Sequence, residues 1–466
     1  MRALRFFCLL CFLSSMMGGG TAWALGKSNA RSLGMGGAYT AVARNLDAVL
    51  WNPANLGLSG GRTVVLGLPS LLFGFGNNAF SSDIYEQYNG KYLTEGDKSD
   101  ILDRIKDGWQ FDTSFRLGVL GLSVGRFGMQ HWVEFASDFA VSQAPFELLF
   151  RGTEVGKTIS LDDFGGEFEL LDVTAISYAH PLPYKALGLG MLGITELTAG
   201  ATVKYILGGA YAKLETPEAG VVFGEYDMHA SGELRIESAG IQWNLGSDKE
   251  GVDPELKPGK TGGGLALDVG AAALLGDQLT VSLGLMNVMG KVTWDTDCER
   301  AIFSFQTDTL NAVSVAEDAT NGDSLYVTSD TSYAIESFES NIPAMLNIGV
   351  AYRLDVAEDG LLGIPMSPLL MKELVLAADW QQGFSSGFGV STTPRIALGI
   401  ENKMLGGVLP LRYGVAFGGT EDIAQTVGWG LYLGPFRWDM GLKNRGYWPF
   451  AGSKGFTWAT RFHLAF

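Results

Sequence analysis

The sequence predicts an all-β membrane protein, an antiparallel transmembrane β-barrel of about fourteen strands with an N-terminal plug in its lumen. The first residues have the pattern of an export signal, and most of the remaining sequence alternates apolar with small or polar residues. One stretch near the N-terminus does not alternate. A period of two is typical of β-strands, and a closed barrel is the non-helical structure that satisfies backbone groups in lipid.

The first residues have the pattern of a secretory signal peptide. Arg2 and Arg5 supply its positive charge, an apolar run covers Phe6–Met17, and Ala22-Trp23-Ala24 is a small-residue cleavage site. We therefore expect residues 1–24 to be removed and the protein to be exported. The mature chain then keeps a single cysteine, Cys298, so no intramolecular disulfide can form.

The composition favours a membrane barrel and excludes some partners. Hydrophobic residues make up 47% of the chain, and its 64 glycines are about twice the average usage. After the signal, no apolar run reaches the roughly eighteen residues of a membrane-spanning helix. The net charge is −17, and losing the signal's arginines makes the mature chain more acidic. An acidic protein is unsuited to bind nucleic acid.

The last strand shows the alternation most clearly. One face carries large apolar residues and the other carries Thr457, Ala459, Arg461, His463 and Ala465. A C-terminal aromatic on such a strand resembles the assembly signal read by the barrel-assembly machinery of bacterial outer membranes. The predicted assembly signal consists of Phe456, Trp458, Phe462, Leu464 and Phe466.

Other segments of about ten residues follow the same pattern. Their second face is mostly Gly and Ala with an occasional charge, which suits a narrow or filled lumen better than a water-exposed sandwich face. Aromatic residues gather near segment ends, as in an interfacial girdle: Trp380, Trp429, Tyr432, Trp438 and Trp458. The remaining predicted strands are 63–68, 115–124, 132–141, 171–180, 197–207, 228–243, 265–274, 279–285, 346–354, 374–380, 395–401, 411–418, 427–433 and 436–443.

Three stretches interrupt the rhythm. Residues 77–109 are polar and helix-prone, residues 247–263 form a linker without periodicity, and residues 294–341 are long and acidic, with room for a hairpin. Outer-membrane barrels carry their long excursions outside, so we assign 77–109 and 294–341 to the outer surface. The expected organisation is a plug segment at 25–60 and a barrel at 61–466.

Motifs of enzymes and metal sites are weak in this chain. Gly121–Gly125 matches G-x-S-x-G but lies in an alternating strand, whereas a nucleophile elbow needs a helix after it. Gly188–Gly193 matches G-x-G-x-x-G, but a strand comes after it instead of a helix. The histidines are scattered, and the acidic loops lack calcium-site spacing. We therefore predict no enzyme, no cofactor and no metal.

The stretch that fails to alternate carries a family resemblance. It contains a glycine cluster from Gly34 to Gly37, then Asn45-Leu46-Asp47-Ala48, then Trp51-Asn52-Pro53-Ala54. This pattern resembles the N-terminal signature of the FadL-type outer-membrane barrels, which include long-chain fatty-acid and aromatic-hydrocarbon channels and the PorV-like secretion barrels. Pro53 ends the preceding turn, and the glycines permit close packing and positive φ.

The resemblance implies a function and its residues. In the transporters of this superfamily the N-terminal segment plugs the lumen, and a hydrophobic ligand leaves through a lateral opening beside a kinked strand. We therefore expect passive uptake of hydrophobic small molecules across a lipid outer membrane. The plug and ligand path would use Gly34, Met35, Gly36, Gly37, Trp51, Asn52, Pro53 and Ala54. The alternative is a PorV-like structural barrel that docks protein partners through its outer loops.

Overall fold

The computed structural model describes most of the chain. It covers residues 28–152, 155–160, 164–225, 227–245, 252–257, 259–307, 326–356, 367, 369–447 and 452–466. The expected signal peptide and its cleavage site lie outside the described residues.

Within these ranges, fourteen antiparallel strands form a closed barrel, which confirms the predicted fold class. Each strand pairs with the next along the wall, and the last strand pairs with the first from Val65↔Ala465 to Gly76↔Gly455. The wall consists, in order, of β1 (Val64–Asn77), β2 (Trp109–Val124), β3 (Phe127–Val141), β5 (Gly165–Pro181), β6 (Ile194–Phe223), β10 (Gly262–Leu275), β11 (Leu279–Trp294), β15 (Met345–Asp355), β16 (Glu373–Gly383), β17 (Arg395–Met404), β18 (Leu409–Gly418), β19 (Ile423–Leu433), β20 (Phe436–Arg445) and β21 (Gly455–Ala465).

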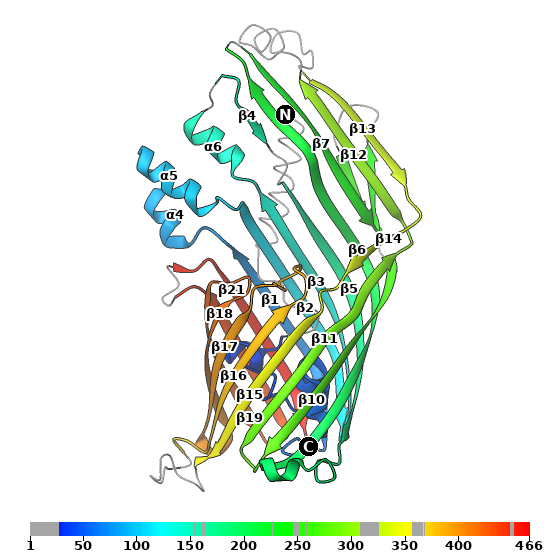
Figure 1. Ribbon diagram of the computed structural model, residues 1–466, viewed down its shortest axis with the longest axis vertical. Coiled ribbons are helices and arrows are strands. Elements are labelled where there is room, and N and C mark those ends of the chain that lie inside the picture. Colours follow the sequence, from blue (N-terminus) through cyan, green and yellow to red (C-terminus); the bar gives the residue numbers. More distant parts are fainter. Residues whose placement is uncertain are drawn as a thin grey trace.

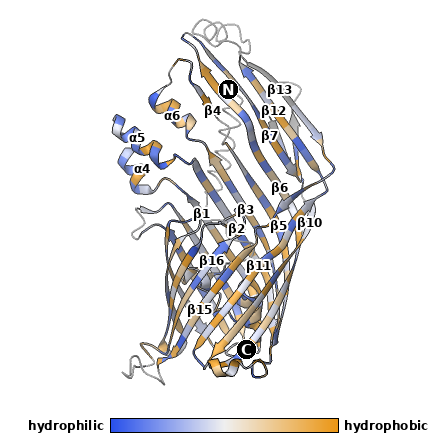
Figure 2. Cartoon of the chain, in the orientation of Figure 1, coloured by the Kyte–Doolittle hydropathy of each residue, from blue (hydrophilic) through white to orange (hydrophobic). Residues whose placement is uncertain are grey.

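The two faces of the wall differ as alternation predicts. Figure 2 shows apolar and polar residues alternating along the strands. In β21 the odd-numbered residues from Gly455 to Arg461 are buried, while the even-numbered aromatic residues face outward. Large apolar residues are exposed on the outward face of other strands, for example Leu120, Tyr205, Leu283, Ile396 and Phe417. Such an apolar outer band is what lipid requires of a barrel wall.

The aromatic residues near strand ends only partly form a girdle. Trp429 and Trp438 meet edge to face, and Trp438 stacks on Phe462 on the outward surface. Tyr432 does not belong to this belt, because it lies on the inward-facing side of β19. Its hydroxyl accepts a hydrogen bond from Arg412 and donates one to Asp439. Its assignment to the girdle was therefore wrong. Alternation along the strand decides which face a side chain lies on, however near the residue is to the strand end.

The two ends of the barrel differ in size (Figure 1). Short turns and the C-terminus lie at one end, and the turns at Gly276 and Gly434 have the positive φ that tight turns need. The other end, which we call the outer end, carries helices and a tall sheet. Its added elements are α4 (Ser82–Tyr88), α5 (Glu95–Arg104), α6 (Ala144–Arg151), β4 (Thr158–Ser160), β7 (Met228–Ala239), β12 (Cys298–Thr307), β13 (Tyr326–Ala334) and β14 (Phe338–Asn341).

The outer sheet, which we define as the outer half of β6 with β7, β12 and β13, stands beyond the wall. Strand β6 runs for 30 residues, and its outer half pairs with β7, which pairs in turn with β12. The predicted strand at 228–243 was therefore wrong as a single barrel strand. It breaks at Gly240, whose φ is +73°, and continues as β8 (Ile241–Leu245).

Two interruptions of the alternation contain local structure. Strand β8 pairs with β9 (Val252–Leu256), so the predicted linker at 247–263 includes a strand after all. Strands β12 and β13 form an antiparallel hairpin, as the long acidic segment suggested. In the described part of the chain, no helix is long and apolar enough to cross a membrane.

Short helical elements occupy the N-terminal part of the described chain and lie inside the barrel (Figure 1). These elements are α2 (Ala30–Gly34), η1 (Asn45–Asp47), α3 (Ala48–Trp51) and η2 (Pro53–Gly57). Two further short elements, η3 (Leu189–Leu192) and η4 (Leu405–Gly407), lie in turns between wall strands.

Candidate functional site

Residues 28–58, which we call the lumen segment, fill part of the barrel interior. All of them are buried except Arg31, Arg44, Asn45 and Gly57, which are half-buried. Helix α2 contacts β18 to β21, whereas η2 contacts β5, β6 and β10 on another part of the wall. The segment therefore bridges the lumen from one part of the wall to another.

Local sequence signals shape the lumen segment. Asn29 caps α2, and its side chain and that of Ser32 bond each other's backbone N–H in a capping box. Gly36 and Gly37 have φ values of +67° and +79°, which residues with a side chain rarely adopt. Asn52 caps η2 by accepting a hydrogen bond from the Ala54 N–H. These features end one helix, reverse the chain and begin the next.

Glycines in the wall allow the lumen segment to approach backbone to backbone. A Cβ at Gly414 would lie 2.2 Å from the nitrogen of Gly36, and one at Gly200 would lie 2.5 Å from the nitrogen of Ala54. The Asn52 amide also donates to the carbonyls of Ala271 and Leu283, at 3.1 and 3.2 Å. The Gly and Ala of the inward face are thus the contact surface for this segment.

Buried ion pairs fix α2 to the wall. The Arg31 guanidinium donates to both oxygens of Glu401, at 2.8 and 2.7 Å. Glu401 also binds Arg412 at 2.6 Å, and Arg412 binds Asp439 at 2.8 Å. The side chains of Glu401, Arg412 and Asp439 are at most 1% exposed. Removing one member of such a network leaves a buried charge without a partner.

A second set of polar contacts fixes the middle of the lumen segment. Asp47 forms an ion pair with Arg461 and accepts hydrogen bonds from Tyr39 at 2.7 Å and Asn29 at 3.1 Å. The backbone N–H of Thr40 donates to Asp379 at 2.9 Å. The segment is therefore held by charged residues on several strands.

The structure places every predicted path residue in this segment. The glycine cluster and the Trp-Asn-Pro-Ala stretch are all buried in the lumen, and Trp51 packs edge to face on Tyr39 with ring centroids 5.5 Å apart. Whether a ligand contacts them stays a prediction. The same holds for the assembly signal at the C-terminus, where four residues lie on the outward face and Phe466 is 59% exposed.

Sequence reasoning gave no role to the wall residues that hold the segment. These residues can be recognised once it is known which face of each strand points inward, because each is a charged residue on a face made mostly of Gly and Ala. They are Asp379, Glu401, Arg412, Asp439 and Arg461.

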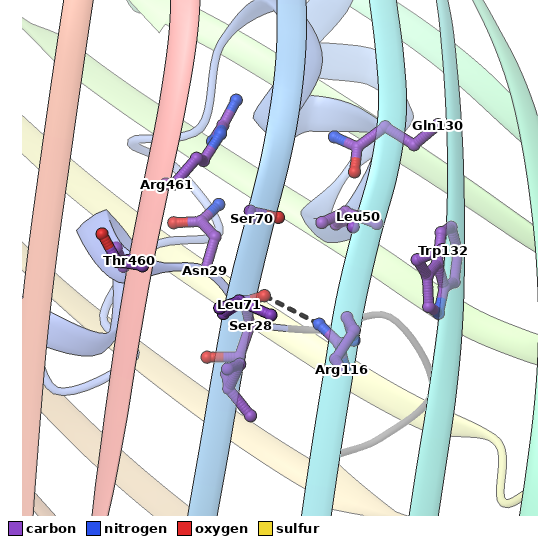
Figure 3. A pocket seen from close by; sticks show the side chains of 13 residues that line it. Ser28, Asn29, Leu50, Ser70, Leu71, Arg116, Gln130, Trp132, Thr460 and Arg461 are labelled. Carbon is purple, nitrogen blue, oxygen red and sulfur yellow. Dashed lines mark hydrogen bonds between the residues drawn. The ribbon is translucent and has the colours of Figure 1, made fainter.

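A small cavity lies between the lumen segment and the wall (Figure 3). Arg116 lines it and donates to the Ser28 carbonyl at 2.7 Å, and it also binds Glu134 at 3.1 Å. The cavity measures about 40 Å³, enough for water but far below the few hundred Å³ of a typical ligand pocket. Its other lining residues include Asn29, Leu50, Ser70, Leu71, Gln130, Trp132, Thr460 and Arg461.

The wall loses its regular register beside this cavity. Between β1 and β21 the pairing shifts from Gly67↔His463 to Ser70↔Arg461, and Pro69 cannot donate a ladder hydrogen bond. Between β2 and β3 it shifts from Gly118↔Trp132 to Leu120↔His131. We call this region the irregular wall patch. Neighbouring bulges bend strands and weaken their pairing locally.

A second irregularity, between β10 and β11, is pinned from inside. Asn287 has a φ of +55°, and its backbone N–H donates to Asp268 at 2.8 Å. Buried Lys204 binds both Asp268, at 3.0 Å, and the Asn287 side chain, at 2.6 Å. Breaking these contacts would leave charges buried and unpaired, so they hold this distortion in place.

The motifs considered for catalysis lie in ordinary wall structure. Gly121–Gly125 belongs mostly to β2, and the Ser123 side chain is buried without a helix after it. Gly188–Gly193 forms a turn around η3 before β6. Among the described residues, no group of three or more His, Cys, Asp or Glu could hold a metal ion.

Solved structures share this fold at low sequence identity. A deltaS2S3 mutant of the monoaromatic hydrocarbon channel TodX has a TM-score of 0.50 and 12% identity, covering 95% of this chain and 100% of its own. The Pseudomonas putida toluene transporter TodX itself has a TM-score of 0.48 and 13% identity, and the match covers 95% of this chain and 99% of its own. The Ralstonia pickettii toluene transporter TbuX has a TM-score of 0.45 and 14% identity, and the match covers 95% of this chain and 99% of its own.

These similar structures are described as channels or transporters and not as enzymes, and the resemblance to the FadL-type barrels is confirmed as a likeness of fold. No curated protein matches the sequence. Residues 54–404 match the model of a family of unknown function, DUF5723, which covers most of the barrel. The chain belongs to the family of unknown function DUF5723.

Proposed function

We propose that this protein lies in an outer membrane and admits hydrophobic small molecules, which enter the lumen from the outer end and leave sideways into the bilayer. The observation that carries the proposal is the cavity beside the irregular wall patch, next to the lumen segment that fills part of the barrel interior. The apolar outward face and the fold shared with hydrocarbon channels support the same proposal.

The lumen segment makes a straight passage along the axis unfavourable. Moving it out would break the Arg31–Glu401 and Asp47–Arg461 pairs and expose its apolar core. Separating a buried ion pair costs several kcal/mol, about 3–5 per lost partner. In this proposal the lumen segment is a stationary plug, and the route turns towards the wall above it.

The irregular wall patch is the exit in this proposal. Its strands already depart from regular pairing, and the cavity behind it reaches wall residues Ser70 and Leu71. Widening this small cavity requires movement of the strands at the patch. A hydrophobic molecule released here enters lipid directly and avoids the aqueous space below the barrel.

A reversible cross-link tests the exit. Leu71 and Thr460 are opposite each other on β1 and β21, so the double variant Leu71→Cys/Thr460→Cys should form a disulfide across the patch. The background carries Cys298→Ser to remove the native thiol. In vesicles with a lipopolysaccharide outer leaflet, oxidation should slow naphthalene entry several-fold, and a reductant should restore it.

The matched control places a cross-link in regular wall. Tyr413 and Val427 are opposite each other on β18 and β19, away from the cavity. Oxidising Tyr413→Cys/Val427→Cys should leave naphthalene entry unchanged. If the Leu71/Thr460 cross-link forms and entry stays at its reduced rate, the exit does not lie at this patch.

The outer sheet supports a second candidate function, the docking of a protein partner. Its apolar side, with Leu214 and Ile236, is covered by Trp243 of the β8–β9 hairpin, so it is a built structure beyond the wall. Replacing the β12–β13 hairpin by a short turn separates the candidates. Unchanged naphthalene entry would favour docking, whereas lost entry would assign the sheet to the transport route.

A further inference from the structure

Carboxylates from neighbouring strands gather on the inward face, on the outer side of the lumen segment. Asp112, Asp138 and Glu167 are direct cross-strand partners on β2, β3 and β5. Glu169 and Glu134 lie on the same face, nearer to the cavity. We call these five residues the acidic cluster. Like charges directly opposite each other destabilise a sheet, so something must offset their repulsion.

The cations of the protein offset only part of this charge. Arg445 binds Asp112 through both oxygens, each at 3.0 Å, and Arg116 binds Glu134. Glu167 accepts a hydrogen bond from the Tyr211 hydroxyl at 2.9 Å. In the described part of the chain, the side chains of Asp138 and Glu169 have neither a hydrogen bond nor an ion pair.

Glu169 is the residue that most clearly lacks its partner. Glu169 is only 7% exposed, and the charges acting on its carboxylate are those of Glu134 and Glu167. A buried carboxylate without a counter-charge is strongly unfavourable. It points into the cluster from the inward face of β5, so a cation arriving in the lumen would bind there.

The surroundings of Glu169 are apolar as well as acidic. Its cross-strand partners are Ala136 and Tyr211, and Ala136 packs against the buried ring of Phe388. Tyr211 packs on Trp294 with ring centroids 5.2 Å apart. Carboxylates beside aromatic rings suit an ammonium group joined to an apolar body, because the rings also attract a cation.

The cluster adjoins the proposed route. Glu134 accepts hydrogen bonds from Arg116 and Trp132, and both of these residues line the cavity at the irregular wall patch. We infer that the acidic cluster is a binding site for amphiphilic organic amines, with Glu169 as the principal contact of the ammonium group. This inference rests on the proposed function and names a substrate class for the same route.

Calorimetry with the full barrel in lipid nanodiscs tests the inference. The probes are 4-phenylbutylammonium, 4-phenylbutanol, 4-phenylbutyrate and Ca²⁺, each corrected with empty nanodiscs. We expect the ammonium compound to bind about tenfold more tightly than the alcohol, because a charge-assisted hydrogen bond is gained. The carboxylate should bind least. Equal binding of the three organic probes, or binding of Ca²⁺ alone, would overturn the inference.

Variants locate the site. Glu169→Gln should bring the affinity for the ammonium compound down to that for the alcohol. It should not harm folding, because it removes an unpaired buried charge. Glu86 is an exposed acid on α4, so Glu86→Gln removes one negative charge, as Glu169→Gln does. This control should bind the ammonium compound like the wild type. Unchanged binding in the folded Glu169→Gln protein contradicts the assignment.

Naphthalene entry, measured on the same preparations, separates the two proposals. If naphthalene enters but the ammonium compound binds no more tightly than the alcohol, the amine site is wrong and the transport proposal stands. If the ammonium compound binds through Glu169 but neither molecule crosses, the transport proposal is wrong and the binding site stands.

Discussion

At the residue scale, charged side chains on the inward face attach the lumen segment to the wall. A charge alone in the barrel interior is costly, and the residues that attach the segment are paired with the segment or with a neighbouring strand. Asp47 and Arg461 are 414 positions apart in the chain, and Arg31 and Glu401 are 370 apart. The pairs therefore form only when the barrel closes around the segment.

Glu401 provides the sharpest test of these pairs, because it lies between Arg31 and Arg412 with no exposed side-chain surface. In Glu401→Gln the guanidinium groups of half-buried Arg31 and fully buried Arg412 lose their shared carboxylate, so the free energy of unfolding should fall by about 3–5 kcal/mol. Urea titration of the barrel in lipid vesicles measures it. Glu339→Gln, which removes an exposed partner of Lys291, should unfold like the wild type. Equal stability of both variants would mean that the pair does not hold the segment.

The backbone contact at Gly414 gives a second residue-scale prediction. Alanine there would place its methyl carbon 2.2 Å from Gly36 and 2.3 Å from Met35, both on backbone atoms. The lumen segment must shift, so Gly414→Ala should raise ion conductance in planar bilayers. Gly190→Ala, in a turn where nothing lies within 4 Å, is the matched substitution and should conduct like the wild type. A sealed Gly414→Ala barrel would argue against tight packing here.

At the element scale, α5 at the outer end is held by carboxylates that titrate. The N–H and hydroxyl of Thr94 donate to Asp97 in a capping box, and they hold the pKa of Asp97 below its ordinary value. Hydrogen bonds from Tyr88 and Arg104 likewise hold the pKa of Asp100 below its ordinary value. A lowered folded-state pKa means stability that is present above the unfolded-state pKa and lost as the pH falls through the folded one.

We therefore expect α5 to keep its order from neutral pH down to about 4, the ordinary Asp pKa, and to loosen below it. A spin label at exposed Asp103 should report greater mobility at pH 2 to 3, within a barrel that stays intact. Thr94→Val should be mobile already at pH 7, because the cap is absent. A spin label at Gly190 should show the same mobility at acidic and neutral pH. If the Asp103 label keeps its mobility in acid, the carboxylates do not hold the helix.

The sequence predicted some elements better than others, for physical reasons. Strands in lipid must alternate, so β15 to β21 are visible in the sequence, and buried Ile101 and Leu102 mark α5 by their spacing. The outer sheet stands beyond the closed wall, where alternation is not required in the same way. Its break at Gly240 and the β8–β9 hairpin depend on contacts with Ala212 and Ala301 that no local pattern reveals.

At the scale of the whole molecule, the barrel and the lumen segment complement each other. The wall presents Gly and Ala where the segment approaches closely and charges where the segment offers counter-charges. The glycine cluster and Asn52-Pro53 could be singled out from sequence because they break the alternation. The acidic cluster could not, because Asp112, Asp138 and Glu167 become neighbours only through strand register.

Removing Gly34–Ala54 tests this division of roles. The wall strands pair with one another, from β1 through to β21 and back, so the shortened chain should still insert as a barrel. The lumen would lose its buried apolar core, and the wall charges at Asp379, Arg412 and Arg461 would become hydrated. Because a water-filled lumen conducts ions, conductance in planar bilayers should rise and naphthalene entry should change.

Heat modifiability on gels checks that the shortened protein has folded before its conductance is measured. The full-length barrel with Glu401→Gln serves as an intermediate, since it loosens the lumen segment without removing it. Conductance should rise from wild type to Glu401→Gln to the deletion, in the order in which the segment loses its contacts. If the folded deletion protein conducts ions and admits naphthalene at wild-type rates, the lumen segment is not a plug, whatever its place in the barrel.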